Sequence, residues 1–288
     1  MKKVYSIAGL IVELTGQRTL QQVAELPGFD IFEMDDYPKT NIDIHIYMDK
    51  IIDTAKLTSI YNIHTFRVLG VNHFFSLCKE GYLYEMYKPD GSKIISLLYD
   101  LSGSSVYTSS SNCEMWIKYA MWVAFTLPAA NRKILPIHAS AIVKDSKAIL
   151  FLGESGTGKS THSRLWLQHI GNSYLLNDDS PMLRLMDNMI LIYGSPWSGK
   201  VHCYKQEAAP LKAMARINRY PENKISCSNK LASIGAIQPS FPPFLAYDWR
   251  YSGIMIRMID RIVRDIPIYE LKCRPDKQAA ETAYAKIY

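Results

Sequence analysis

Ala148-Ile149-Leu150-Phe151-Leu152-Gly153-Glu154-Ser155-Gly156-Thr157-Gly158-Lys159-Ser160 is the stretch that decides the fold. The apolar run predicts a buried strand, the three glycines predict a tight loop, and the segment from Lys159 to Ile170, ended by Gly171, predicts a helix. A strand, a glycine-rich loop and a helix in this order are typical of a phosphate-binding loop. The sequence therefore predicts a nucleoside triphosphate site here.

Each part of this loop has a physical reason to hold phosphate. The glycines let successive backbone N–H groups face inward, and the helix adds the positive end of its dipole. Lys159 is expected to reach the β- and γ-phosphates and the Ser160 hydroxyl to bind Mg²⁺, with Thr161 behind it. The residues expected to bind ATP are Gly153, Glu154, Ser155, Gly156, Thr157, Gly158, Lys159, Ser160 and Thr161.

Two acidic residues follow the next predicted strand, Tyr174 to Leu176. They are Asp178 and Asp179. A triphosphate site needs an acidic contact for its metal, and two adjacent carboxylates at a strand end are costly unless a cation or a proton shares them. The alternative is a surface pair that opens the turn before Pro181.

The N-terminal half has a different pattern, in which apolar and polar residues alternate from Val4 to about Ser110. The period of two is clearest in Ile42 to Tyr47 and Tyr82 to Tyr87, and Pro89-Asp90-Gly91 supplies a turn before Ile94 to Tyr99. This pattern predicts a β-rich N-terminal domain of antiparallel strands over residues 1–112.

A helical stretch from Glu114 to Leu127 follows, with Asn112 or Ser111 as its N-cap and Pro128 at its end. We place the domain boundary within about ten residues of Asn112. Residues 113–288 are expected to form the second domain, because short apolar runs there alternate with helices as in an α/β core. Its further elements are expected strands at 137–143, 182–185 and 189–193, and a helix with a solvated face at 258–264.

Composition narrows the classes of function. The chain has 288 residues, 48% of them hydrophobic, and its formal net charge is +6. Its Lys and Arg are scattered and interleaved with Asp and Glu, a distribution that indicates no nucleic-acid partner. Its most apolar segment, Ala120 to Ala130, is about half the length of a membrane span, and no signal peptide is apparent. Five separated cysteines indicate neither a disulfide framework nor a zinc site. These features predict a cytoplasmic protein with no membrane partner.

The segment from Pro136 to Pro181 resembles the catalytic domain of HPr kinase/phosphorylase, whose P-loop is related to that of ATP-dependent phosphoenolpyruvate carboxykinase. The matching parts are Ile137-His138-Ala139-Ser140-Ala141-Ile142, then Gly153 to Thr161, then Asp178-Asp179. Two later segments, Tyr193 to Lys200 and Ile266 to Leu271, look like a divergent branch of kinase-like proteins found beside peptide-modification genes. The resemblance implies an α/β P-loop kinase core preceded by the β-rich domain.

By this resemblance, Asp178 is the base that accepts the proton of an attacking hydroxyl, and Asp179 joins Ser160 around Mg²⁺. His138 lies beside the transferring phosphoryl group, and Lys159 neutralises charge. The alternative for His138 is a strand-end histidine that is hydrogen-bonded in the core. The resemblance also implies self-association into a homo-oligomer.

The sequence departs from the family at the Glu-x-Arg-Gly-x-Gly signature, which is absent, so HPr is not implied as the acceptor. Lys200 and His202 are candidates to meet phosphate oxygens from the far side of the site. Arg250 and Arg257 are weaker candidates for acceptor contacts, and Trp249 is expected to be a core or interface aromatic.

Three hypotheses of function follow. The first is an ATP-dependent phosphotransferase, an HPr kinase-like serine kinase, that moves the γ-phosphate to a hydroxyl of a serine or threonine in a protein or peptide, or of a small molecule. The second is a non-catalytic ATP-binding sensor or regulatory protein. The third is a carboxykinase-like enzyme that acts on a small organic acid, although the upstream lysine and histidine that bind its metal are not found.

Overall fold

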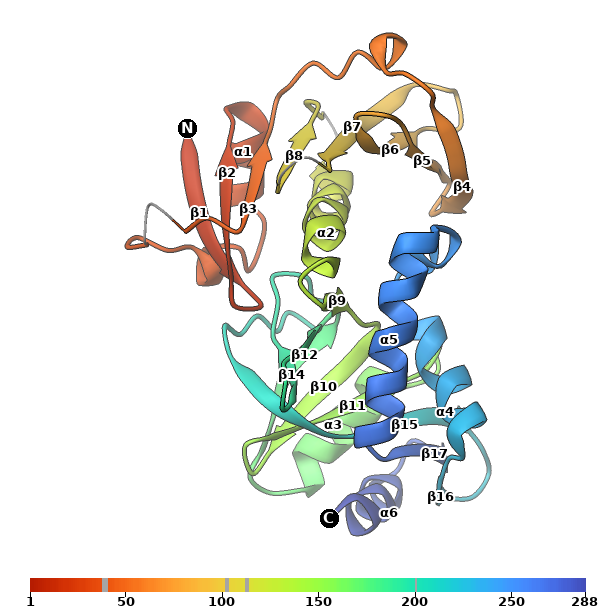
Figure 1. The fold of residues 1–288 in the computed structure, drawn as a ribbon. Coiled ribbons are helices and arrows are strands. Elements are labelled where there is room, and N and C mark those ends of the chain that lie inside the picture. The colour runs from red at the N-terminus through yellow and green to blue at the C-terminus, as the bar shows by residue number, and fades with distance from the viewer. Residues whose placement is uncertain (38–40, 102–103, 112–113, 200) are drawn as a thin grey trace. The chain divides into compact units, whose positions relative to one another are not determined.

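The computed structural model describes residues 1–37, 41–101, 104–111, 114–199 and 201–288. The fold is mixed α/β with two sheets, and it divides into two compact units, Met1–Arg132 and Lys133–Tyr288 (Figure 1). Each unit has its own sheet and its own buried core.

The first unit contains an eight-stranded sheet of order β1-β2-β3-β8-β7-β6-β5-β4. Its strands are β1 (Lys2–Ile7), β2 (Leu10–Thr15), β3 (Ile44–Tyr47), β4 (Tyr61–Val68), β5 (Val71–Leu77), β6 (Gly81–Tyr87), β7 (Lys93–Asp100) and β8 (Ser105–Thr108). Strand β3 is parallel to both β2 and β8, so the expectation of a wholly antiparallel domain is wrong there. Long connections rather than hairpins join β3 to these neighbours, and side-chain alternation carries no information on strand direction.

Helices in this unit are α1 (Arg18–Ala24), α2 (Glu114–Ala130) and the short 3₁₀ turns η1 (Asp30–Phe32) and η2 (Thr54–Lys56). Helix α2 packs on β7 and β3 of the sheet and on α1. The observed division after Arg132 therefore falls later than the boundary expected near residue 112, because α2 is buried with the first unit rather than the second. Asn112, one of the two proposed caps, lies outside the described residues.

Pro128 does not end α2, as was expected, but lies inside it. A proline there removes one backbone hydrogen bond near the end of the helix. The flanking residues Leu127 and Ala129 are fully buried, which holds the last turn in place. The apolar segment 120–130 is thus part of a packed helix, and among the described residues no helix is long and apolar enough to cross a membrane.

The second unit contains a nine-stranded sheet of order β12-β10-β11-β15-β14-β13-β9, with β17 beside β15 and β16 beside β17. Its strands are β9 (Ile134–Pro136), β10 (Ala139–Lys144), β11 (Lys147–Leu152), β12 (Ser173–Asp179), β13 (Met182–Leu185), β14 (Ile190–Tyr193), β15 (Ala208–Arg219), β16 (Lys224–Cys227) and β17 (Ile268–Cys273). The strand expected at 137–143 is split, since the chain leaves β9 at Pro136 and enters β10 at Ala139. Residue 138 lies in that break.

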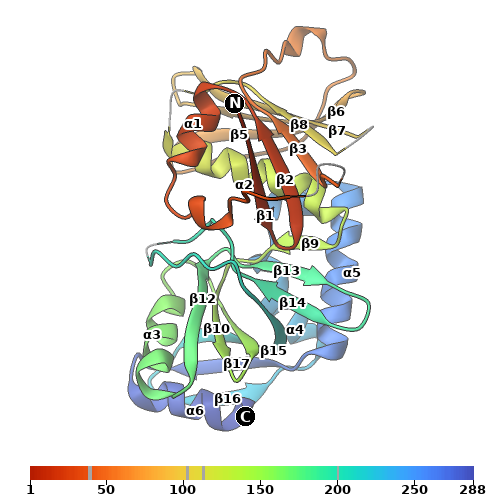
Figure 2. The same ribbon diagram turned by 90° about the vertical axis from the view of Figure 1, so that its left-hand side faces the viewer.

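Helices cover both faces of this sheet (Figure 2). They are α3 (Lys159–His169), α4 (Lys230–Ile237), α5 (Trp249–Asp265) and α6 (Lys277–Ile287), with the 3₁₀ turns η3 (Gln238–Ser240) and η4 (Pro243–Tyr247). Alternate residues of β15, such as Ala213, Ala215 and Ile217, pack toward α3 and α6, whereas Arg216 donates to the Ala236 carbonyl of α4. The α/β character expected of this half is confirmed.

The face under α3 and α6 holds a core cluster that anchors α3 to the sheet. Trp166 is fully buried there, with its ring centroid 5.4 Å from that of Phe151 and 6.1 Å from that of Tyr284. Its indole N–H donates to Ser173 Oγ at 3.2 Å. One side chain thus links α3 to β11, β12 and α6.

We predict that Trp166→Ala lowers the free energy of unfolding by about 3–5 kcal/mol, because it leaves a cavity in this cluster. Leu167→Ala is the matched control, since the next residue of α3 is 39% exposed, and it should cost less than about 1 kcal/mol. Urea unfolding followed by circular dichroism measures both. Equal losses in the two variants would contradict the packing described here.

Candidate functional site

The loop between β11 and α3 has a backbone that requires its glycines. Gly153, Gly156 and Gly158 have φ of 151°, 79° and 111°, in the region that favours glycine. A Cβ added to Gly153 would lie 2.5 Å from Thr157 Oγ1. The loop therefore depends on these residues for its shape, and Gly158 is the N-cap of α3.

Lys159, the first residue of α3, folds back over this loop. Its ammonium donates to the carbonyls of Gly153 at 2.9 Å and Glu154 at 3.2 Å. The side chain is buried, and burial lowers the pKa of Lys159; Asp179 and Asp178 oppose this effect, and Arg216 adds to it. The lysine is thus a partly desolvated cation within electrostatic reach of two carboxylates.

These carboxylates are the last two residues of β12, which is longer than the strand expected at 174–176. In the register of the sheet, Asp178 pairs with Ser140 and Asp179 with Ala139 of β10. Asp178 is buried, whereas the side chain of Asp179 is 50% exposed. Asp179 has φ 136°, an uncommon value for a residue with a side chain.

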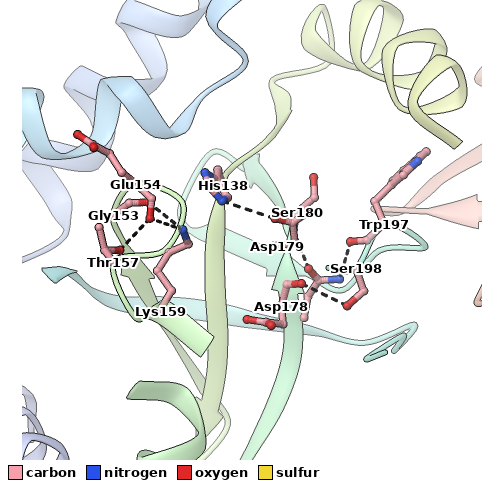
Figure 3. A network of polar contacts seen from close by, with 11 residues as sticks. His138, Gly153, Glu154, Thr157, Lys159, Asp178, Asp179, Ser180, Trp197 and Ser198 are labelled. Carbon is pink, nitrogen blue, oxygen red and sulfur yellow. Dashed lines mark hydrogen bonds and ion pairs between the residues drawn. The ribbon is translucent and has the colours of Figure 1, made fainter. Parts of the chain in front are cut away.

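The segment after β14 holds the backbone of the two aspartates. Ser198 Oγ and the Gly199 N–H donate to the Asp178 carbonyl at 3.2 and 2.6 Å, and Asp179 forms an isolated β-bridge with Ser198. Before them, the buried Asn177 amide donates to backbone oxygens of Ser195 and Trp197. Several hydrogen bonds therefore fix this strand end, as Figure 3 shows in part.

His138 lies between the loop and the aspartates (Figure 3). Its backbone N–H donates to the Ser240 carbonyl at 2.7 Å, and its Nε2 is 3.5 Å from Asp179 Oδ1. Burial and the nearby Lys159 lower the pKa of His138, while Asp179 and Asp178 oppose the shift. The ring is 39% exposed and faces a carboxylate, so it is not a histidine enclosed in the core.

The structure thus brings four of the expected residues into one electrostatic group: His138, Lys159, Asp178 and Asp179. Ser155 and Ser160 are exposed on the loop and the first turn of α3, and Thr161 is half-buried. Glu154 is exposed, with its Oε1 3.7 Å from Arg216.

Other expected residues are not joined to this group by any contact among the described residues. Arg250 and Arg257 lie on α5. The Arg250 guanidinium lies over the Trp249 ring, with its Cζ 5.7 Å from the ring centroid. Trp249 is 76% exposed, so of the two expected places, core or interface, the core is wrong and the interface stays a prediction. It is the first residue of α5, after the capping Asp248. His202 is exposed with its ring near Tyr204, and Lys200 lies outside the described residues.

Two arginines of β15 that the sequence did not single out also contact the loop. Arg219 donates to the carbonyl of Gly156 and, at 3.4 Å, to that of Thr157. Arg216 faces Glu154, as described above. In the sequence Arg216 and Arg219 only come after the apolar run from Ala213 to Ala215, and nothing local shows that β15 pairs in parallel with β11.

Comparisons with known proteins add little to this geometry. No protein-family model matches the chain, and no curated protein matches it. Among solved structures, it is similar to the HPr(Ser) kinase/phosphatase from Coxiella burnetii, with 12% sequence identity over 52% of this chain and 95% of that chain and a TM-score of 0.31. At this TM-score the likeness carries no inference about activity, which depends on the side chains above.

We predict that Gly199→Ala destabilises the protein by about 1–3 kcal/mol, the usual cost of overpacking. An added Cβ would lie 3.1 Å from Asp179 Cβ and 3.2 Å from the Asp178 carbonyl oxygen, so the strand end must shift. Gly235→Ala in α4 is the control, because its Cβ would meet nothing within 4 Å and alanine favours a helix. Unfolding in urea should separate the two variants, and no loss in Gly199→Ala would refute the close packing.

Proposed function

We propose that this protein is an ATP-dependent phosphotransferase that moves the γ-phosphoryl group to a hydroxyl, that of a serine or threonine in a protein or peptide. The observation that carries this proposal is the placement of Lys159, Asp178, Asp179 and His138 beside one glycine-rich loop at the start of a helix. A cation, a pair of carboxylates and a glycine-rich loop at the start of a helix are the parts that phosphoryl transfer uses.

The loop Gly153–Thr161 is the proposed triphosphate site. Its N–H groups and the N-terminus of α3 favour an anion. Among the described residues, the ammonium of Lys159 donates to two backbone carbonyls. Phosphate oxygens would replace these neutral acceptors with charged ones, which bind an ammonium more strongly. Nucleotide binding would therefore give this desolvated cation charged hydrogen-bond acceptors in addition to the nearby carboxylates.

Ser160 and Asp179 are the proposed Mg²⁺ ligands. A hydroxyl and a carboxylate are hard oxygen donors, and Mg²⁺ in nucleotide enzymes keeps several waters and takes only one or two protein ligands besides phosphate. The donor set fits such an ion, because Asp179 is half-exposed at the strand end and Ser160 is exposed on α3. When bound, Mg²⁺ would neutralise charge on the β- and γ-phosphates.

Asp178 is the proposed general base. Its carboxylate would accept the proton of the acceptor hydroxyl while the hydroxyl oxygen forms a bond to the γ-phosphorus and the bond to the β–γ bridging oxygen breaks, releasing ADP. The carboxylate is buried, and its backbone is fixed by Ser198 and Gly199. A fixed base loses little entropy when the acceptor arrives.

His138 is the proposed contact to the transferring group. Its lowered pKa means that the ring is neutral at pH 7, so that one nitrogen can donate a hydrogen bond. The Nε2 atom is near Asp179, which favours the tautomer with the proton on Nε2. This single N–H would pass from Asp179 to a phosphoryl oxygen once Mg²⁺ takes the carboxylate. We also propose that the protein acts in the cytoplasm, because the proposed reaction needs ATP.

We predict that Lys159→Ala abolishes tight binding of Mg·ATP, with a loss of about 30-fold or more, because the phosphates lose a buried charged partner. Lys147→Ala is the control, since Lys147 is exposed at the other end of β11. Calorimetric titration of ATP with Mg²⁺ measures both. If the wild-type chain binds no nucleotide, the proposed function fails.

We predict that Asp178→Asn lowers phosphoryl transfer by about 100-fold or more while ATP affinity changes by only a few fold, because the amide cannot accept the proton. Asp187→Asn, at an exposed turn, is the control. Mass spectrometry of serine- and threonine-containing peptides incubated with ATP should show a gain of about 80 Da. Transfer that persists in Asp178→Asn refutes the assigned base, and tight ATP binding without transfer to any acceptor favours the sensor hypothesis.

A further inference from the structure

A cavity of about 570 Å³ opens beside the loop, on the face of the sheet that α3 covers. Its volume falls in the range of about 300–1,000 Å³ that small-molecule sites have. The lining residues nearest the loop are Thr157, Gly158 and Thr161, so the cavity is continuous with the proposed triphosphate site.

The far wall of this cavity comes from the carboxyl ends of two neighbouring parallel strands, β15 and β17. Tyr220 and Pro221 follow β15, and Arg274 and Pro275 follow β17. The Tyr220 N–H donates to the Cys273 carbonyl at 3.1 Å, which joins the two strand ends. Ligands of open α/β sheets bind at such carboxyl ends.

Asn223 fixes the same wall from behind. Its side-chain oxygen accepts from the Arg274 N–H, and its amide donates to Asp276 Oδ1, both at 2.9 Å. Asp276 also caps α6 and pairs with Arg274 Nε at 3.0 Å. The wall is therefore preformed, and the charge of Arg274 is already paired.

His162 lines the cavity and is almost fully buried. Neither ring nitrogen has a hydrogen-bond partner among the described residues, and its ring centroid is 4.5 Å from that of Phe151. A buried polar group without a partner is uncommon in a closed core and is expected next to a site that a ligand or water fills.

Arg219 stands where the loop meets the cavity. It donates to two loop carbonyls, and within the part of the chain that the structure describes no carboxylate pairs with it. Its positive charge is therefore available to an anion at the mouth of the cavity.

We infer that this cavity holds the base and ribose of the nucleotide whose triphosphate occupies the loop, an inference that rests on the proposed function. The end away from the loop is mainly apolar, with Tyr220, Pro221, Pro275 and Leu165. Tyr220 is 43% exposed, so its ring has accessible surface for stacking. At the apolar end the base is held by stacking, which every purine offers, so adenine and guanine nucleotides are expected to bind alike.

The test is calorimetry on the full chain with Mg·ATP, Mg·GTP and Mg·tripolyphosphate. Tyr220→Ala should weaken both nucleotides by about tenfold or more, the usual effect of losing one stacked base, and should leave tripolyphosphate within about twofold. Tyr220→Phe should restore the wild-type affinities. Tyr61→Ala, at a tyrosine that is 68% exposed on β4, is the control.

The outcomes separate this inference from the proposed function. If neither tripolyphosphate nor any nucleotide binds to the wild-type chain, the phosphate site itself is refuted. If nucleotides bind but Tyr220→Ala changes nothing, or weakens tripolyphosphate as much as ATP, the cavity is not the nucleoside site. A preference of more than tenfold between ATP and GTP would overturn recognition by stacking alone. Thermal unfolding of each variant shows that it remains folded.

Discussion

The register of β10 between its two neighbours is the constraint on which the candidate site depends. Ala139, the first residue of β10, pairs with Leu152 on one side and with Asp179 on the other. His138 precedes Ala139, and Gly153 follows Leu152. Three segments that are far apart in sequence therefore meet at one edge of the sheet. A slip of one residue would turn each side chain to the opposite face and separate the histidine from the carboxylate.

The two aspartates at the site stabilise positive charge on the buried lysine and on the histidine. Burial disfavours the cationic form of both Lys159 and His138, and the charge of Lys159 further disfavours a cationic His138, whereas Asp178 and Asp179 favour both cations. Removal of the two carboxylates would leave the desolvated ammonium of Lys159 with, in the part of the chain that the structure describes, two carbonyl oxygens as its hydrogen-bond partners. A triphosphate adds more negative charge than the lysine can match, which is why an additional cation beside Asp179 is physically reasonable.

The sequence predicts the local part of this site well, because its signals are local. The loop from Gly153 to Ser160, the strand before it and the helix after it can be identified from residue order alone, and β13 has the predicted bounds. The parallel pairings of β15 with β11 and β17 could not be predicted, since they join residues more than fifty positions apart. Arg219 and Tyr220 were missed for this reason, because only that pairing brings them to the loop.

The helix and domain boundaries were harder to predict, because burial overrides the local signal. Pro128 lacks a backbone N–H and would be expected to end a helix. Leu127 and Ala129 on either side of it are fully buried, and α2 continues through Pro128. The same burial assigns α2 to the first unit. Local residue chemistry does not show which surface an apolar helix will cover.

The backbone of Asp179 is strained, and this strain lowers the stability of the folded chain. A non-glycine residue at φ 136° costs on the order of 1–3 kcal/mol and persists only when its surroundings hold it. Here the neighbours do so: Asn177 is anchored by two carbonyls, Ser198 and Gly199 bind the preceding carbonyl, and Ser198 bridges Asp179 itself. A relaxed strand end would turn the Asp179 carboxylate away from His138. The strain therefore has a clear physical consequence, which is to keep that carboxylate pointed at the edge of the sheet where the loop lies.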